Sequence, residues 1–73
     1  MTVAARVIAT HPGSVDIRVD AEAWPLLGLR VGDHAIIETG EGDLVRGTVV
    51  ADGVINGFVP PDAASIRVRR PQP

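Results

Sequence analysis

Near the middle of the chain, residues 19–33 read Val19-Asp20-Ala21-Glu22-Ala23-Trp24-Pro25-Leu26-Leu27-Gly28-Leu29-Arg30-Val31-Gly32-Asp33, and this central stretch is the most informative about the fold. It leaves an alternating strand, passes through a short apolar segment and turns at Gly32-Asp33 into the next strand. We predict a helix at about residues 20–29, with Asp20 as its N-cap and Gly28 in a left-handed conformation at its end. Pro25 should keep this helix short, because proline removes a helical hydrogen bond.

On both sides of this stretch, short runs of β-branched residues alternate with turn residues. In the second run, Val15, Ile17 and Val19 alternate with polar residues, which indicates a strand with one buried face. Turn signals such as Pro12-Gly13 and Asp52-Gly53 separate the runs. The sequence therefore predicts an all-β fold, a small six-stranded barrel, with strands at residues 3–9, 14–19, 34–38, 44–51, 54–59 and 65–69.

The same alternation selects the residues of the core, and the leucines of the central stretch should close one end of the barrel. We expect the core to contain Val7, Val15, Ile17, Val19, Leu27, Leu29, Ile36, Val45, Val49, Ile55, Val59, Ile66 and Val68. A weak internal repeat accompanies this pattern, because a shift of 42 positions lays Val7-Ile8-Ala9 over Val49-Val50-Ala51. A structural repeat and chance explain these few matches equally well.

Composition and length limit the class of protein. The chain has 73 residues, no cysteine and a formal net charge of −2, which excludes a generally basic coat for nucleic acid. We expect one barrel domain over residues 1–70 and a disordered tail at 71–73. No apolar run approaches the roughly 20 residues of a membrane span, and no signal-peptide pattern is present, so we expect a cytoplasmic protein without a membrane partner. A chain this small would gain stability from pairing, and we expect a homodimer.

The central stretch resembles a sequence shared by the cradle-loop barrels, in which a strand leads into a short helix, Leu-Gly-Leu and Gly-Asp. One such family is the double-psi barrel of the molybdopterin-dinucleotide-binding domains in formate dehydrogenase-type oxidoreductases. The resemblance continues through Ile37-Glu38-Thr39 and Gly57-Phe58-Val59 and covers about residues 15–69. It implies a double-psi-like barrel and a small cofactor-binding subunit or enzyme. Because the segments that such domains use around the cofactor are missing, we expect no cofactor here.

Residues 17–45 are also similar to the AbrB/MazE-like swapped-hairpin proteins, which implies a dimeric DNA-binding regulator or antitoxin. Asp20 stands where that family usually has proline, and Trp24 where it usually has arginine. Under this hypothesis Arg18, Arg67 and Arg69 would contact phosphates, and binding would weaken steeply with salt.

The arginines of the last predicted strand are the most suggestive charges for binding. Arg67 and Arg69 should project from one face, with Arg70 just beyond and Arg18 on the polar face of its own strand. Such a patch fits phosphates or an acidic partner, but charges on an outer strand also prevent aggregation. Trp24 fits two interpretations, a cap on the barrel end and an exposed anchor for a partner.

No residue set predicts catalysis or a metal site. His11 and His34 have no third ligand at a suitable spacing, and Ser14 has no neighbouring base in the sequence. The acidic residues Glu38, Glu41 and Asp43 lack the spacing of a calcium loop. We therefore predict a non-enzymatic binding or interaction module for a partner protein or small molecule, with the DNA-binding and cofactor-subunit hypotheses as alternatives.

Overall fold

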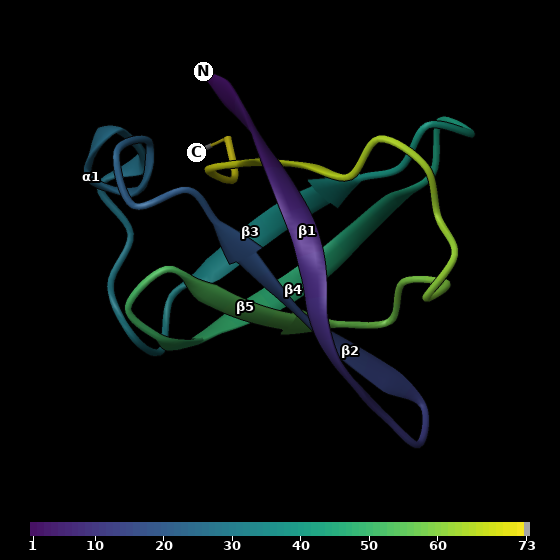
Figure 1. Cartoon of the computed structure of the whole chain (residues 1–73). Coiled ribbons are helices and arrows are strands. Elements are labelled where there is room, and N and C mark those ends of the chain that lie inside the picture. Colours follow the sequence, from purple (N-terminus) through teal and green to yellow (C-terminus); the bar gives the residue numbers. More distant parts are fainter. Residues whose placement is uncertain (73) are drawn as a thin grey trace.

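Six strands close into an antiparallel barrel in the computed structural model, which describes residues 1–72. The predicted all-β fold with one short helix is confirmed (Figure 1). The elements are β1 (Thr2–His11), β2 (Ser14–Val19), α1 (Trp24–Leu27), β3 (His34–Glu38), β4 (Leu44–Ala51), β5 (Val54–Gly57) and β6 (Arg67–Arg69). The predicted tail at 71–73 lies partly outside the described residues, since Pro73 is not among them.

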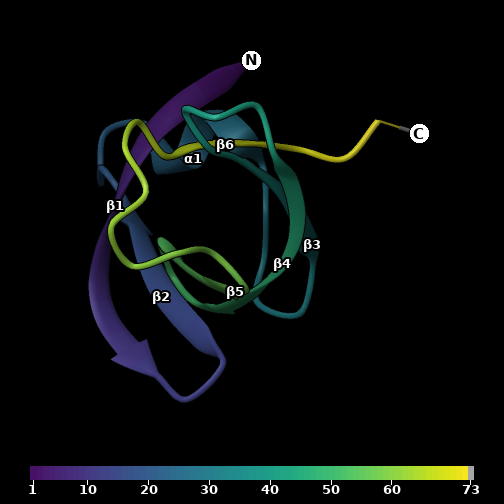
Figure 2. The same ribbon diagram turned by 90° about the vertical axis from the view of Figure 1, so that its right-hand side faces the viewer.

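The strands follow each other around the barrel in the order β1-β2-β5-β4-β3-β6, and β6 returns to β1. Strands β3, β4 and β5 are joined by consecutive hairpins, and β6 comes back beside β3, which is the Greek-key arrangement. Figure 2 shows how β1 and β2 form one wall of the barrel and β3 and β4 another. The barrel brings the end of β2, the start of β1 and the β4–β5 turn to one side.

The barrel consists of two halves with the same topology. Exchanging β1 with β4, β2 with β5 and β3 with β6 leaves every pair of neighbouring strands unchanged. Each half begins with a bulged hairpin, and the bulges lie between Val7 and Ala9 and between Val49 and Ala51. These bulges are 42 positions apart, as in the sequence repeat. The weak repeat therefore coincides with a structural one.

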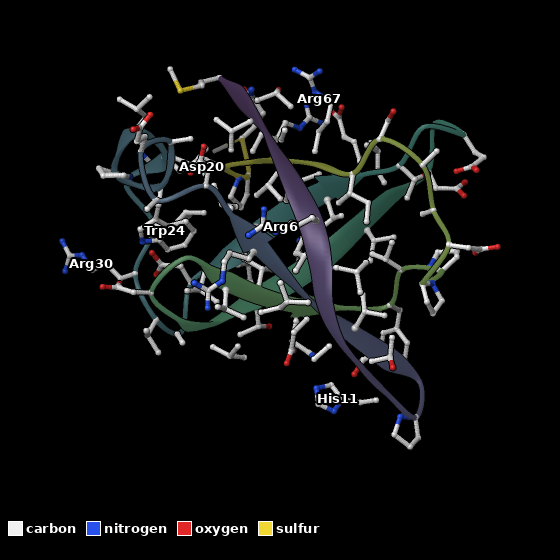
Figure 3. All side chains as sticks on the ribbon, viewed as in Figure 1. Arg6, His11, Asp20, Trp24, Arg30 and Arg67 are labelled. Carbon is white, nitrogen blue, oxygen red and sulfur yellow. The ribbon has the colours of Figure 1, made fainter. Side chains whose placement is uncertain are left out.

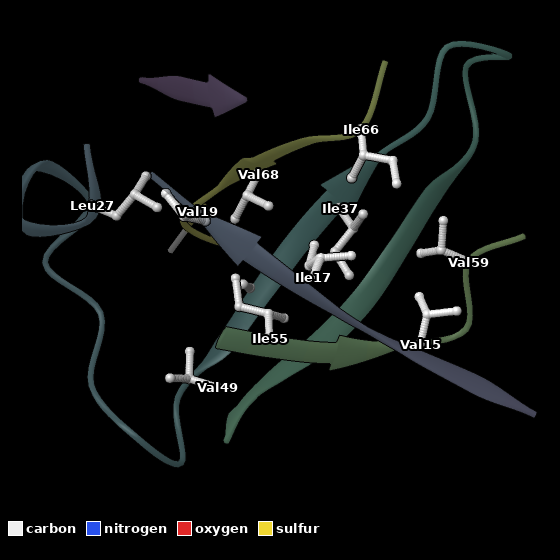
Figure 4. Packing of buried hydrophobic residues seen from close by; sticks show 11 residues of the cluster. Val15, Ile17, Val19, Leu27, Ile37, Val49, Ile55, Val59, Ile66 and Val68 are labelled. Atoms are coloured by element: carbon white, nitrogen blue, oxygen red, sulfur yellow. The ribbon is translucent and has the colours of Figure 1, made fainter. Parts of the chain in front are cut away.

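The barrel interior is filled by aliphatic side chains from β2, β3, β4, β5 and β6, from α1 and from the segment before β6 (Figure 4). The buried cluster is Val15, Ile17, Val19, Leu27, Ala35, Ile37, Val49, Ile55, Val59, Ile66 and Val68. Val7, Leu29 and Val45, which were predicted to be in the core, are partly buried and pack against this cluster.

The prediction for Ile36 is wrong, because Ile37 points into the core and Ile36 is only half-buried. Two consecutive isoleucines leave the phase of a strand undetermined by its own pattern. The neighbouring strands decide it: a Cβ added at Gly47 or Gly57 would lie 2.8 Å from Ile37 Cδ1. Two glycines thus leave the space that Ile37 fills.

Helix α1 is shorter than predicted and begins differently. Residues 20–23 form a turn in which the Asp20 carbonyl accepts hydrogen bonds from the N–H groups of Ala23 and Trp24. Ala23, and not Asp20, is the N-cap, and no side chain caps the helix. The left-handed Gly28 is confirmed, with φ of 65°. With four residues, α1 is far too short to cross a bilayer, and no other helix exists in residues 1–72.

Candidate functional site

A pocket of about 660 Å³ opens between the start of β1, the end of β2 and the β4–β5 turn. Its polar lining consists of Arg6, Arg18, Asp20 and Asp52, and Trp24 and Gly53 also contribute. We call it the arginine pocket. Its volume lies in the range of about 300–1,000 Å³ that is typical of small-molecule sites.

Two arginines lie side by side on one wall of this pocket. Arg6 on β1 and Arg18 on β2 are direct partners in the β1–β2 ladder, and both are exposed. Neither belongs to an ion pair in the part of the chain that the structure describes. Like charges directly opposite each other in a ladder destabilise it, so this pair of cations is poised to bind an anion. The sequence analysis missed Arg6, since the register that brings it to Arg18 depends on a bulge.

Trp24 forms the flat wall of the pocket. The indole is half-buried and packs against the core with part of its surface. The Trp24 N–H donates to the Asp20 carbonyl at 2.9 Å, which fixes the start of α1 against the end of β2. Figure 3 shows Arg6 on β1 and both Asp20 and Trp24 on the side of the barrel that carries α1. Trp24 therefore packs against the core and also lines the arginine pocket.

The remaining wall comes from the β4–β5 turn. The Val19 N–H donates to the Gly53 carbonyl at 2.9 Å, so the turn is held against the end of β2. Gly53 has a φ of 76°, a conformation that glycine adopts without strain. This turn carries Asp52, and with Asp20 it adds two carboxylates to a pocket that also holds two cations. The pocket thus offers both donors and acceptors of hydrogen bonds.

The arginines predicted to form one patch lie in different surroundings. The Arg69 Nε atom is buried and lies 3.3 Å from Glu38 Oε1 without making a hydrogen bond. Arg70 reaches the end of α1, since a Cβ at Gly28 would lie 3.4 Å from its Nη1 atom. Arg67 is exposed and lines a second, smaller groove. Of the predicted residues, only Arg18 and Trp24 meet in the arginine pocket.

A polar cluster lies at the β1–β2 hairpin, away from the pocket (Figure 3). His11 Nε2 is 2.9 Å from Asp16 Oδ2, and Asn56 Nδ2 donates to Asp16 Oδ1 at 2.9 Å. The hydrogen bond with His11, and then that from Asn56, lowers the pKa of Asp16 from its ordinary value. Ser14 Oγ accepts a hydrogen bond from Asn56, so its contact is with an amide. These hydrogen bonds fix the orientation of the polar side chains at the hairpin.

The two histidines and the acidic residues lie apart in the fold. In residues 1–72, no group of three or more histidine and acidic side chains is arranged to hold a metal ion. Glu38 lies beside Arg69, and His34 lies on β3, whereas His11 lies at the hairpin. The arginine pocket therefore remains the candidate site with converging charges and an aromatic wall.

The pocket also distinguishes the two halves of the barrel. The connection from β2 to β3 carries α1 and Trp24, but the matching connection from β5 to β6 carries no helix. The pocket lies where the two halves meet, since β1, β2 and Trp24 of the first half and the β4–β5 turn of the second half line it. No family model, curated protein or solved structure matches this chain.

Proposed function

We propose that this protein is a non-enzymatic binding module whose arginine pocket takes a small anionic ligand with a flat ring. The observation that carries the proposal is the direct opposition of Arg6 and Arg18 without a neighbouring carboxylate in an ion pair. An anion between the two guanidinium groups would replace repulsion with charge-assisted hydrogen bonds.

The other walls support a ligand with more than a negative charge. The half-buried Trp24 offers an aromatic face, on which a flat ring packs favourably. Asp20 and Asp52 can accept hydrogen bonds from hydroxyl or amino groups of the same ligand. The four charges would orient the ligand by its two ends, and the indole would hold its middle.

Three other features that the sequence suggests stay predictions. They are the double-psi or swapped-hairpin type of the barrel, the homodimer and the role as a cofactor-binding subunit. DNA binding through Arg18, Arg67 and Arg69 gains no support from the arrangement of these residues, since Arg69 lies beside Glu38. The charges and the aromatic wall of the arginine pocket support the small-molecule hypothesis, and we rank it first.

Intrinsic fluorescence tests this proposal directly, because Trp24 is the only tryptophan and the chain has no tyrosine. Phenyl phosphate, inorganic phosphate and benzyl alcohol serve as probes that separate the contributions of charge and ring. We expect a saturable change in Trp24 emission, with phenyl phosphate binding more tightly than either of the other two. Equal weak responses to all three would contradict a site that combines an anion and a ring.

Variants connect the response to the two arginines. Arg6→Ala and Arg18→Ala should each weaken phenyl phosphate binding at least tenfold. Arg46→Ala is the matched control, since Arg46 is exposed on β4 and does not line the pocket. If Arg46→Ala weakens binding as much as Arg18→Ala, the effect is one of general charge and the proposed pocket is wrong.

A further inference from the structure

Strand β1 is paired along most of its length on one side but only near its start on the other. β2 pairs with residues from Ala5 to His11, whereas β6 pairs with residues from Thr2 to Ala4. On the β6 side, the Ala5 N–H still donates to the Ile66 carbonyl at 3.0 Å. From Val7 onward, this edge of β1 has no neighbouring strand among residues 1–72.

The backbone N–H and C=O groups of Val7 point toward this open edge. In an antiparallel ladder, every second residue directs its N–H and C=O to the same neighbour. Because Ala5 donates toward β6, Val7 presents its groups to that side as well. No backbone hydrogen bond outside the regular ladders involves Val7 in the described residues. Val7 is therefore a free pairing position on this edge of β1 among residues 1–72.

The chain that runs past this edge does not complete the ladder. The groove beside Val7 is bounded on its far side by Pro61, Ala63 and Ile66. Pro60 and Pro61 have no N–H and cannot donate to a strand beside them. A groove of about 380 Å³ is left between β1 and the 61–67 segment. We call it the β1 edge groove.

The charges of the groove select the kind of strand that would fit. Arg6 lines one side and Arg67 the other, and both side chains are exposed. Neither forms an ion pair with a carboxylate of the described chain. The walls between them are small or apolar. An extended peptide with alternating acidic and apolar side chains would match both features.

We propose that the β1 edge groove binds an extended acidic segment of a partner protein as an additional strand. Main-chain hydrogen bonds to Val7 would provide affinity, and alternate acidic side chains would pair with Arg6 and Arg67. A second copy of this chain fits less well, because its β1 carries no acidic residue that could pair with Arg6 and Arg67. The inference is separate from the small-molecule proposal, and Arg6 is the only charged residue that lines both sites.

Amide chemical shifts test this inference. The probe is an acetylated and amidated hexapeptide of alternating glutamate and valine, and a lysine–valine hexapeptide is its control. We expect the Glu–Val peptide to shift the Val7 amide signal and the lysine peptide to leave it in place. If the Val7 amide does not move, or moves equally with both peptides, the proposal is overturned.

Backbone methylation of the probe then distinguishes strand pairing from attraction of charge. Two Glu–Val peptides are methylated at alternate amides, so that each loses the donors of one edge only. One of them should lose binding at least tenfold and the other should keep it, since a strand pairs through one edge at a time. Equal binding by the two would overturn the proposal.

Variants separate this site from the arginine pocket. Arg67→Ala should weaken binding of the Glu–Val peptide at least fivefold and leave the response of Trp24 to phenyl phosphate unchanged. Arg18→Ala should weaken the response to phenyl phosphate and leave binding of the Glu–Val peptide unchanged. Arg46→Ala should affect neither. A shift of the Val7 amide that follows protein concentration without any peptide would identify a second copy as the occupant, and the proposal would fall.

Discussion

Arg6 and Arg18 stand directly opposite each other because of one extra residue in β1. From the hairpin turn, the ladder pairs His11 with Ser14 and Ala9 with Asp16. Continued without interruption, this register would place Arg6 opposite Val19, whose side chain is buried. The bulge between Val7 and Ala9 shifts the register by one residue, so that two outward-facing arginines meet. The bulge thus creates the charged wall of the arginine pocket.

Replacing one arginine should stabilise the unliganded protein while it abolishes the site. In Arg18→Thr, a β-branched residue takes the place of one of two opposed like charges, and we expect a gain of about 0.2–1 kcal/mol in the free energy of unfolding. Urea unfolding at low salt measures the gain, and high salt should reduce it. A loss of stability in this variant would show that Arg18 has a favourable contact in the folded state.

Leu27 should be essential for stability, since it is 1% exposed at the end of α1. We expect Leu27→Ala to cost about 2–5 kcal/mol in urea unfolding. The adjacent Leu26 is 62% exposed, and Leu26→Ala is a matched control with an expected change within about 0.5 kcal/mol. Similar costs for the two variants would contradict the orientation of α1.

The Cδ1 methyl group of Ile37 should exclude any side chain at Gly57 on β5. A Cβ at Gly57 would lie 2.8 Å from Ile37 Cδ1, and its other neighbours are at least 3.6 Å away. Gly57→Ala should therefore cost about 1–3 kcal/mol. Ile37→Val removes Cδ1, so the double variant should lose less stability than the sum of the two single variants. Additive losses, measured by urea unfolding, would mean that the strand backbone and not Ile37 excludes a side chain at this position.

Low pH should lower the free energy of unfolding, because Asp16 then becomes protonated. Hydrogen bonds from His11 and Asn56 lower the pKa of Asp16 in the folded state. This carboxylate therefore contributes stability that is complete above the ordinary pKa of an aspartate and is lost as the pH falls through the lower, folded-state value. Unfolding measured between about pH 6 and pH 2.5 should show this loss, and Asp16→Asn should reduce it. Asp62→Asn, at an exposed position, should retain the acid dependence of the unmodified chain.

Local patterns in the sequence were sufficient to place most elements. The bounds of β2, β3 and β4 agree with the prediction, because each is an apolar run ended by turn residues. Gly28 was assigned a left-handed conformation from its position after Leu27, and its φ is 65°. The last strand begins at Arg67 instead of residue 65, since Ser65 has a φ of 56° that a strand does not accept.

The number of strands, the short helix and the buried face of β2 follow from the sequence, because each depends on neighbours along the chain. Which isoleucine of β3 is buried and which arginine lies beside Arg18 follow only from the folded barrel. Both depend on residues far apart in the chain: Ile37 fills the space left by Gly47 and Gly57, and the bulge in β1 sets its register against β2. Pairing register has a period of two residues, so a shift of a single residue changes every face, and only the closed barrel fixes it.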